Sequence, residues 1–211
     1  MQQKFSSIKN IIFDFGGVIL NIDYNLSVEA FKKLGVDHFD KLYSKAEQTV
    51  LFDGLEEGTT PYTVFRENVR AISKFVLTDK QIDFAWNALI LDLPKERIDF
   101  LLQLKRKYRT FLLSNTNEMH YKGFTADLQR VHQLEKLDVL FEKAYYSHVI
   151  GLRKPHREVF DLVINENGLN PKETLFIDDT ERHVHGAIAA GLHGHWLKNG
   201  EDIITLLKHL L

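Results

Sequence analysis

The sequence has 211 residues and contains no cysteine. This absence excludes disulfide bonds, thiolate metal ligands and cysteine nucleophiles. An excess of charge of either sign is also missing, because 27 Lys and Arg residues face 29 Asp and Glu residues and leave a formal net charge of −2. Without an overall positive field, the chain lacks the electrostatic signature of a nucleic-acid-binding protein.

Long apolar runs are missing as well. The first ten residues are polar, and the apolar run that follows them is interrupted by Asp14. Neither a signal peptide nor a membrane span can be recognised from such a pattern, so we expect a cytoplasmic protein without a membrane partner. What is present, 44% apolar and 27% charged residues, is typical of a globular domain of ordinary stability.

The pattern of apolar residues changes twice along the chain. Residues 8–15 predict a buried strand, and residues from about 26 to 93 have helical periodicity without a convincing strand. Within that block, Ser27 and Thr78 are candidate N-caps, and Gly35 is a candidate stop for the first helix. After Pro94, strands are predicted at 109–114, 144–149, 174–178 and 193–197, alternating with helices at 95–107, 117–133, 156–167, 181–190 and 201–210.

This alternation predicts an α/β fold, because strands separated by helices form a parallel sheet through right-handed crossovers. We expect a three-layer, Rossmann-like core made of residues 1–21 and 95–211. The helical block, residues 22–94, is then a cap inserted after the first strand. There is no repeat or Pro- and Gly-rich linker that would tether the cap loosely.

Polar residues follow four of the predicted buried segments. In an open α/β sheet, ligands bind beyond the carboxyl ends of the strands, so these clusters are expected to meet there. Each cluster alone is compatible with ordinary turn or cap chemistry. The four clusters are Asp14 with Gly16-Gly17, Ser114-Asn115, Arg153-Lys154 and Asp178-Asp179. Together they supply a carboxylate nucleophile, hydroxyl and amide donors, a cation and a group of metal ligands, all of which phosphoryl transfer requires.

With these motifs in this order, the sequence closely resembles the haloacid dehalogenase-like hydrolase superfamily. The resemblance rests on Phe-Asp-Phe-Gly-Gly-Val at 13–18, Leu-Leu-Ser-Asn at 112–115, Lys-Pro at 154–155 and Phe-Ile-Asp-Asp at 176–179, and it spans nearly the whole chain. It is greatest for the phosphatase branch with a small helical cap and an Asp-x-Gly first motif, which is similar to sugar 1-phosphate phosphatases. It implies an Mg²⁺-dependent phosphatase that acts on a small phosphorylated metabolite.

The resemblance also implies roles for individual residues. Asp14 would attack phosphorus and form an aspartyl-phosphate. Asp14, the backbone carbonyl of Gly16 and Asp179 would bind Mg²⁺, with Asp178 as a further ligand or as a partner of the ligands. Phosphate would be held by Gly17, Ser114, Asn115 and Lys154, and Lys154 would also neutralise charge on the nucleophile.

The sequence departs from the family pattern at Gly16. Most phosphatases of the family have a second Asp there, which protonates the leaving group and then activates water, and losing such a group costs on the order of 10²–10⁴-fold in rate. Three explanations are open: Asp23 near the entry to the cap replaces it as acid and base, the substrate has a good leaving group, or the chain is a weak enzyme or a phosphate-binding regulator. Asp23 is equally suited to cap a helix.

The same departure disfavours a phosphomutase, which must also deprotonate a hydroxyl group. The pair Asp178-Asp179 disfavours a dehalogenase, which needs no metal.

In the cap, residues 52–58 resemble a loop that faces the substrate in relatives, although Phe52 and Leu55 are equally compatible with packing between helices. The His-x-His pairs at 183–185 and 193–195 could suggest a transition-metal site, but without a nearby third ligand they are expected to lie on the surface. Arg66 and Arg70 share a helix face and could bind a second anionic group, although salt bridges are the commoner use.

Overall fold

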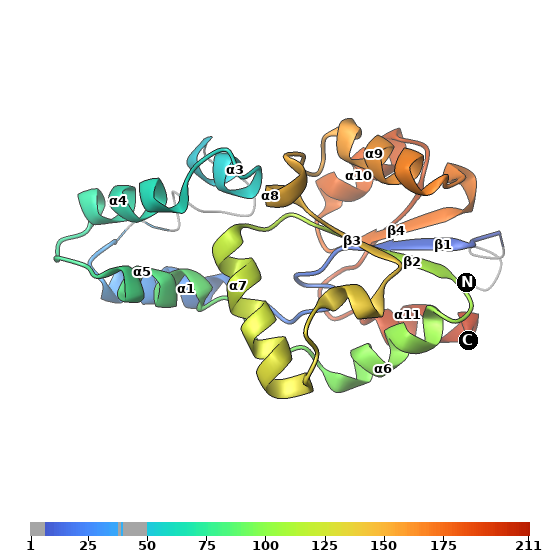
Figure 1. The fold of residues 1–211 in the computed structure, drawn as a ribbon, viewed down its shortest axis with the longest axis horizontal. Helices are drawn as coiled ribbons and strands as arrows, with labels where there is room; N and C mark the ends of the chain where they lie inside the picture. The colour runs from blue at the N-terminus through green and yellow to red at the C-terminus, as the bar shows by residue number, and fades with distance from the viewer. Residues whose placement is uncertain (1–6, 38, 40–49) are drawn as a thin grey trace.

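The computed structural model describes residues 7–37, 39 and 50–211. Its centre is a five-stranded sheet in which every pair of neighbours is parallel (Figure 1). The spatial order is β3-β2-β1-β4-β5. The strands are β1 (Asn10–Phe13), β2 (Arg109–Ser114), β3 (Lys143–Tyr146), β4 (Thr174–Asp178) and β5 (His193–Trp196). The predicted α/β class and parallel core are therefore confirmed.

Helices cover both faces of the sheet. The side chains of Ile11 and Phe13 lie in one apolar cluster and that of Ile12 lies in another, because successive residues of a strand point to opposite faces. The first cluster is completed by α6 (Lys95–Leu104), α7 (Glu118–Asp127) and α11 (Ile203–Leu207), and the second by α9 (Arg157–Asn167) and α10 (Glu181–Ala189). Burial on both faces explains why these strands are nearly continuous apolar runs.

The helices of the predicted insert form a separate group beside the sheet (Figure 1). They are α1 (Tyr24–Lys33), α3 (Val50–Glu56), α4 (Tyr62–Ile72) and α5 (Asp79–Asn87). Aromatic rings fill their interior: Phe31 stacks on Phe39 with 3.9 Å between ring centroids, and the buried Trp86 packs against Phe52 and Phe65. All the buried residues of this third cluster fall within 22–94.

Two of the three predicted helix signals in this block are confirmed. Thr78 caps α5, and its side chain and that of Gln81 form a reciprocal capping box. Gly35 follows the end of α1 with φ +78°, the left-handed conformation that terminates helices. The prediction for Ser27 was wrong: Asp23 is the N-cap of α1, while Ser27 is buried inside the helix and donates to the carbonyl of Trp86.

The predicted elements after Pro94 all exist, with differences at their ends. The predicted helix at 95–107 ends at Leu104, and the one at 201–210 is α-helical only over Ile203–Leu207. The predicted strand at 144–149 stops at Tyr146, where the short helix α8 (Ser147–Ile150) begins. The predicted helix at 117–133 is α-helical only to Asp127 and continues as a π-helical turn over Leu128–His132. In the last two places apolar side chains continue past the end of the element, so periodicity alone does not mark its end.

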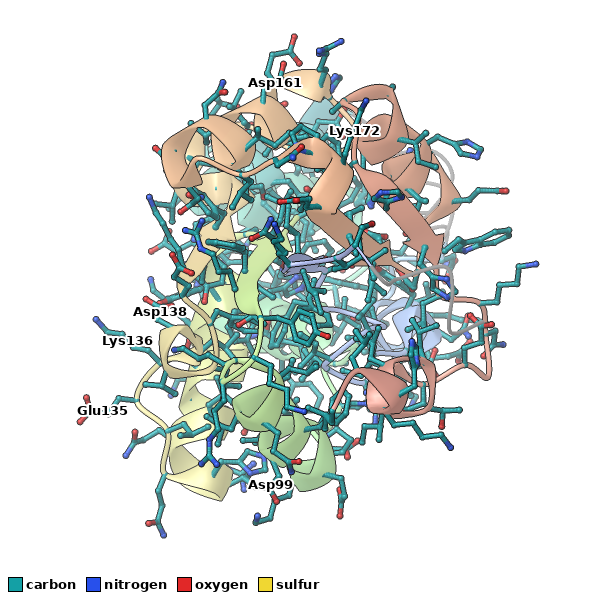
Figure 2. All side chains as sticks on the ribbon, turned by 90° about the vertical axis from the view of Figure 1, so that its right-hand side faces the viewer. Asp99, Glu135, Lys136, Asp138, Asp161 and Lys172 are labelled. Carbon is teal, nitrogen blue, oxygen red and sulfur yellow. The ribbon has the colours of Figure 1, made fainter. Side chains whose placement is uncertain are left out.

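Charged side chains point outward from both helical layers. Figure 2 shows Asp99, Asp161 and Lys172 projecting from opposite sides of the sheet, away from the ribbon. Such an intermixed surface agrees with the near-neutral formal charge. Among the helices of the described residues, none is both long enough and apolar enough to cross a membrane.

Candidate active site

Two carboxylates from neighbouring strands meet at the carboxyl edge of the sheet. Asp14 directly follows β1, and its backbone N–H donates to the carbonyl of Ile177 at 2.9 Å, which fixes it beside the end of β4. Asp178 is the last residue of β4. The side chain of Asp178 is fully buried and that of Asp14 is 11% exposed. Two negative groups so deeply buried require a compensating cation.

Lys154 supplies that cation from the loop after α8. Its fully buried Nζ donates to Asp14 Oδ1 and to Asp178 Oδ2, both at 2.7 Å. The side chain of Asn115 fixes the backbone of Lys154 from both sides: its Oδ1 accepts from the Lys154 N–H at 2.9 Å, and its Nδ2 donates to the Lys154 carbonyl at 3.0 Å. The loop after β2 therefore holds the lysine in place.

The two bridged carboxylates differ in their affinity for protons. The pKa of Asp14 is raised to about 7: burial is the largest cause, the charges of Asp178 and Asp179 add to it, and Lys154 opposes them. Burial would also raise the pKa of Asp178, but the charge of Lys154 and a hydrogen bond from His183 outweigh it, so this pKa lies below its ordinary value. Without a further cation, Asp14 is the member of the pair that takes up a proton near neutral pH.

Asp14, Asp178 and Asp179 each offer an oxygen to one point, with these atoms within 4.8 Å of one another. The backbone at Gly17 makes room for Asp179: its φ is +76°, and a Cβ there would lie 2.3 Å from Asp179 Oδ2. Three converging carboxylates, one with a raised pKa, suit a hard divalent cation such as Mg²⁺. Both oxygens of Asp178 accept bonds from protein donors and its side chain is fully buried, whereas Asp14 and Asp179 are partly exposed.

His183 belongs to this site, which corrects the sequence prediction that it lies on the surface. It is 7% exposed, and its Nδ1 lies 3.2 Å and 3.1 Å from the two oxygens of Asp178. His185 is exposed, as predicted. Asp178 is the last residue of β4 and His183 lies in the first turn of α10, so the burial of His183 depends on which face of the helix meets the sheet. No local pattern in the sequence indicates that face.

A small pocket lies between this edge of the sheet and the cap. From the core it is lined by Gly16, Ser114 and Asn115, and from the cap and its entry by Tyr24 and Glu56, with the remaining walls mostly apolar. Ser114, the last residue of β2, is 3% exposed. The structure therefore brings together every residue that the sequence singled out for phosphate and metal binding.

Asp23 is placed differently from those residues. It does not line the pocket, and its Oδ1 accepts from the backbone N–H of Asn25 at 2.9 Å as the N-cap of α1. Beside Gly16, the space in front of the backbone is occupied by Ile22, whose Cδ1 would lie 3.1 Å from a Cβ at position 16. Any side chain at position 16 would therefore come into close contact with the apolar side chain of Ile22.

An ion-pair cluster joins the cap to the core next to the pocket. The guanidinium of Arg153, with a side chain 6% exposed, donates to Glu56 Oε2 from Nε at 3.0 Å and from Nη2 at 2.8 Å, and to Asp53 Oδ1 from Nη1 at 2.6 Å. Glu56 and Asp53 come from α3. Within the segment 52–58, Phe52 and Leu55 are buried in the cap interior, whereas Glu56 reaches the pocket. The sequence indicated this segment but not the residue within it.

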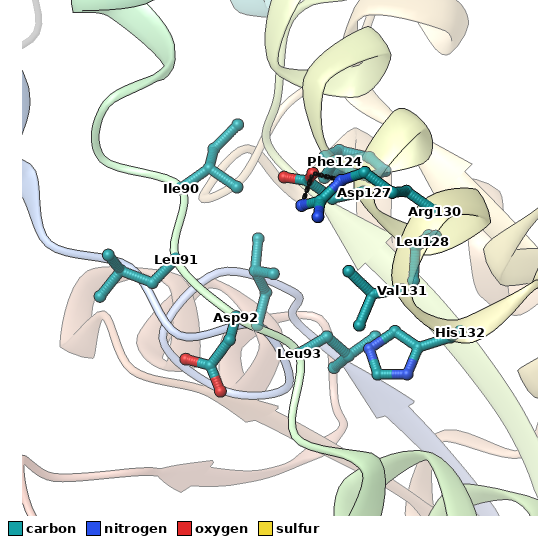
Figure 3. A pocket seen from close by; sticks show the side chains of 11 residues that line it. Ile90, Leu91, Asp92, Leu93, Phe124, Asp127, Leu128, Arg130, Val131 and His132 are labelled. Carbon is teal, nitrogen blue, oxygen red and sulfur yellow. Dashed lines mark hydrogen bonds and ion pairs between the residues drawn. The ribbon is translucent and has the colours of Figure 1, made fainter.

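A second pocket lies behind the first, on the far side of Leu20, Ile90 and Phe124, which line both (Figure 3). Asp127 and Arg130 form an ion pair at its rim. None of the polar residues that the sequence singled out lines this second pocket, whereas Gly16, Ser114 and Asn115 line the first, so the first pocket is the candidate site for phosphoryl chemistry.

The remaining polar candidates from the sequence are accounted for by local contacts. Arg66 and Arg70 form ion pairs on the cap, with Asp83 and with Glu67 respectively, and both also pair with Asp79. Among the described residues, no group of three possible metal ligands contains a histidine.

Comparison with known proteins places this geometry in a family. The profile of the haloacid dehalogenase-like hydrolases matches residues 8–191. The D-ribitol-5-phosphate phosphatase of Bacteroides thetaiotaomicron is 34% identical over 195 residues, which cover 92% of this chain and 94% of that protein. The glyceraldehyde 3-phosphate phosphatase of Pyrococcus furiosus is 22% identical over 200 residues, covering 93% of this chain and 72% of that protein.

A solved structure shows the same architecture. It is that of a haloacid dehalogenase family enzyme from Bacteroides thetaiotaomicron, an Asp-to-Ala variant in complex with magnesium and inorganic phosphate. The two chains superpose with a TM-score of 0.88 and 36% identity, covering 95% of this chain and 98% of the other.

Proposed function

This chain belongs to the haloacid dehalogenase-like hydrolase family, and on that premise we propose that it is an Mg²⁺-dependent phosphatase of a small phosphorylated sugar or polyol. The observation that carries the proposal is the bridge from Lys154 Nζ to Asp14 and Asp178 beside Asp179. Relatives over most of the chain are named as phosphatases of D-ribitol 5-phosphate and of glyceraldehyde 3-phosphate, which supports the substrate class.

In this proposal Asp14 is the nucleophile. Its carboxylate attacks phosphorus, the bond from phosphorus to the leaving oxygen breaks, and an aspartyl-phosphate forms; water then attacks the same phosphorus and releases phosphate from Asp14. Lys154 keeps Asp14 ionised and oriented and binds the phosphoryl oxygens. Ser114 Oγ and the backbone N–H group of Asn115 hold the other oxygens as charge moves during transfer. The backbone N–H of Gly17 donates to the carbonyl of Leu20 at 2.8 Å, so Gly17 contributes the shape of the loop and not a donor to phosphate.

Asp14, Asp179 and the carbonyl of Gly16 would hold Mg²⁺, with Asp178 supporting the cluster from its buried side. The bound ion would offset the repulsion between a dianionic phosphate and the carboxylates. The same proposal treats residues 22–94 as a cap that encloses the substrate, with residues 1–21 and 95–211 as the catalytic core. The separate aromatic interior of α1, α3, α4 and α5 supports that division, and residues 38 and 40–49 lie outside the described part of the cap.

The test is phosphate release from a panel of sugar and polyol phosphates and from an aryl phosphate, with Mg²⁺ and with chelator. We expect Mg²⁺-dependent turnover that is lost in Asp14→Asn and retained in Asp99→Asn, a matched change at an exposed position on α6. Normal turnover by Asp14→Asn would contradict the assignment of the nucleophile. No turnover by the unmodified chain on any member would contradict the phosphatase function.

A further inference from the structure

The proposed phosphatase function leaves one proton transfer without a residue. The relatives named above act on phosphates of primary alcohols, and such an alcohol leaves as a strongly basic alkoxide that needs a proton. Position 16 has no side chain, and Ile22 occupies the adjacent space. Another group must therefore stand at the pocket.

Three described titratable side chains line the pocket outside the Asp14 cluster, namely Tyr24, Glu56 and His120. His120 is committed elsewhere: its Nε2 donates to the carbonyl of Trp86 at 3.1 Å, so Nδ1 is unprotonated and accepts from Asn117 Nδ2 at 3.0 Å. Burial lowers the pKa of His120 to about 4, which keeps it neutral. A phenol ordinarily ionises near pH 10, so Tyr24 is a poor base for the second half-reaction.

We propose that Glu56, carried by the cap, is the general acid and base of this enzyme in place of the carboxylate missing at position 16. The proposal rests on the phosphatase function described above. It takes up the role that the sequence had assigned to Asp23, whose carboxylate caps α1 away from the pocket.

The position of Glu56 is fixed by the two loops that carry the rest of the site. Its Oε2 accepts from Arg153, the neighbour of Lys154, and lies 3.4 Å from Nδ2 of Asn115, the neighbour of Ser114. These contacts hold the Glu56 carboxyl group at the wall of the pocket. Arg153 acts as a positioning residue, because it holds a cap side chain in register with the nucleophile and the phosphate site.

The surroundings of Glu56 also favour its protonated form over that of an ordinary carboxyl group. Burial raises its pKa, the charge of Asp53 adds to this effect, and the charges of Arg153 and Lys154 oppose it; the net change is upward. A carboxyl group with a raised pKa can be protonated before the leaving group departs and ionised afterwards, as both half-reactions require.

The proton balance is as follows. While Asp14 attacks phosphorus, the bond to the leaving oxygen breaks and its electron pair stays on that oxygen, which takes the proton of Glu56 and leaves as an alcohol. The resulting Glu56 carboxylate then removes a proton from water as the water oxygen attacks the aspartyl-phosphate. The bond from phosphorus to Asp14 breaks, Asp14 regains its carboxylate, and Glu56 is protonated again.

Glu56→Gln separates this role from a structural one when two substrates are compared. The leaving group of an aryl phosphate departs without taking up a proton. The leaving group of an alkyl phosphate such as D-ribitol 5-phosphate needs a proton as it departs. We expect kcat/KM to fall about 10²–10⁴-fold for the alkyl substrate and less than about tenfold for the aryl substrate. Because the variant also lacks the base, it should release one equivalent of phenol in a burst and then turn over slowly.

The matched control is Asp53→Asn, which removes the other partner of Arg153 from the same helix but no carboxylate from the pocket. It should lower kcat/KM for the alkyl substrate far less than Glu56→Gln does, because Glu56 keeps its carboxyl group and loses only the charge of Asp53 beside it. An equal loss for both substrates in Glu56→Gln, or a selective loss in Asp23→Asn instead, would overturn the proposal. If the unmodified protein hydrolyses neither substrate, the phosphatase function itself fails, which is a distinguishable result.

A second measurement needs no variant and so does not depend on folding of the mutant. In the unmodified protein, ionisation of Asp14 changes kcat/KM by the same factor for the alkyl and the aryl substrate. The ratio of the two kcat/KM values therefore does not depend on the ionisation of Asp14. This ratio should fall as pH rises through the ionisation of Glu56. A ratio that does not change with pH would contradict a titrating acid.

Discussion

The Nζ atom of Lys154 lies 2.7 Å from Asp14 Oδ1 inside a site where the lysine side chain has no exposed surface. The same ammonium also lies 2.7 Å from Asp178 Oδ2, so one cation compensates two buried carboxylates from adjacent strands. Removing one member of a buried ion pair leaves its partner charged without compensation, and this typically costs about 3–5 kcal/mol.

Lys154→Met should therefore destabilise the metal-free protein in a manner that depends on pH. The pKa of Asp14 is already raised to about 7 with the lysine present, and removing the lysine raises it further. A carboxyl group whose pKa is higher in the folded than in the unfolded protein stabilises the fold when it is protonated. This contribution to the free energy of unfolding is complete below the unfolded-state pKa and is lost as the pH rises through the folded-state pKa. The deficit of Lys154→Met, measured by urea unfolding in chelator, should thus be larger at pH 8 than at pH 5.

Lys95→Met is the control for this measurement. Lys95 pairs with Asp99 on the surface of α6, where both side chains are more than half exposed, so the change should cost less than about 1 kcal/mol at either pH. An equal deficit for Lys154→Met at pH 5 and pH 8 would contradict the proposed charge compensation.

Gly17→Ala should weaken Mg²⁺ binding. An added Cβ would lie 2.3 Å from Asp179 Oδ2, so the carboxylate must move out of the acidic cluster. We expect at least a tenfold loss in Mg²⁺ affinity, measured as the dependence of the thermal unfolding midpoint on Mg²⁺ concentration. The indole of Trp196 donates to the Asp179 carbonyl at 3.0 Å, which gives a fluorescence signal for the same titration.

Gly168→Ala isolates the steric part of this effect. Gly168 also has a positive φ, of +58°, but a Cβ there would meet no atom within 4 Å. Both variants should lose about 1 kcal/mol to the left-handed conformation, and only Gly17→Ala should lose Mg²⁺ affinity. Unchanged affinity in Gly17→Ala would separate Asp179 from the metal site.

His183→Leu should lower activity by about tenfold without preventing substrate binding. The imidazole contacts both oxygens of Asp178, and its loss would leave that carboxylate with fewer partners to orient it beside Lys154. The measurement is kcat and KM for the same substrate, with the reduction expected in kcat. His185→Leu, two residues along the same helix on its exposed side, should leave both parameters unchanged.

Much of the fold could be predicted because the responsible physics is local. The bounds of β2 and β4 were predicted to the residue, since each is a short apolar run of branched and aromatic residues between turn signals. Thr78 and Gly35 were recognised because a side-chain cap and a left-handed residue act within a few positions of the helix end. Ser27 was misjudged because Asp23 competes for the same helix start, and only packing against Trp86 decides between them.

The sequence by itself determined that Asp14, Ser114, Lys154 and the pair Asp178-Asp179 follow buried segments in a fixed order, and that Gly16 offers no acidic side chain. The parallel sheet brings the ends of its strands to one edge, so this order suffices to assemble the polar groups. Tertiary structure alone decided that Glu56 meets Arg153, 97 residues away, and that His183 turns inward to Asp178. Both depend on how a helix face packs against another element, and that choice is made by the whole interior rather than by neighbours in the sequence.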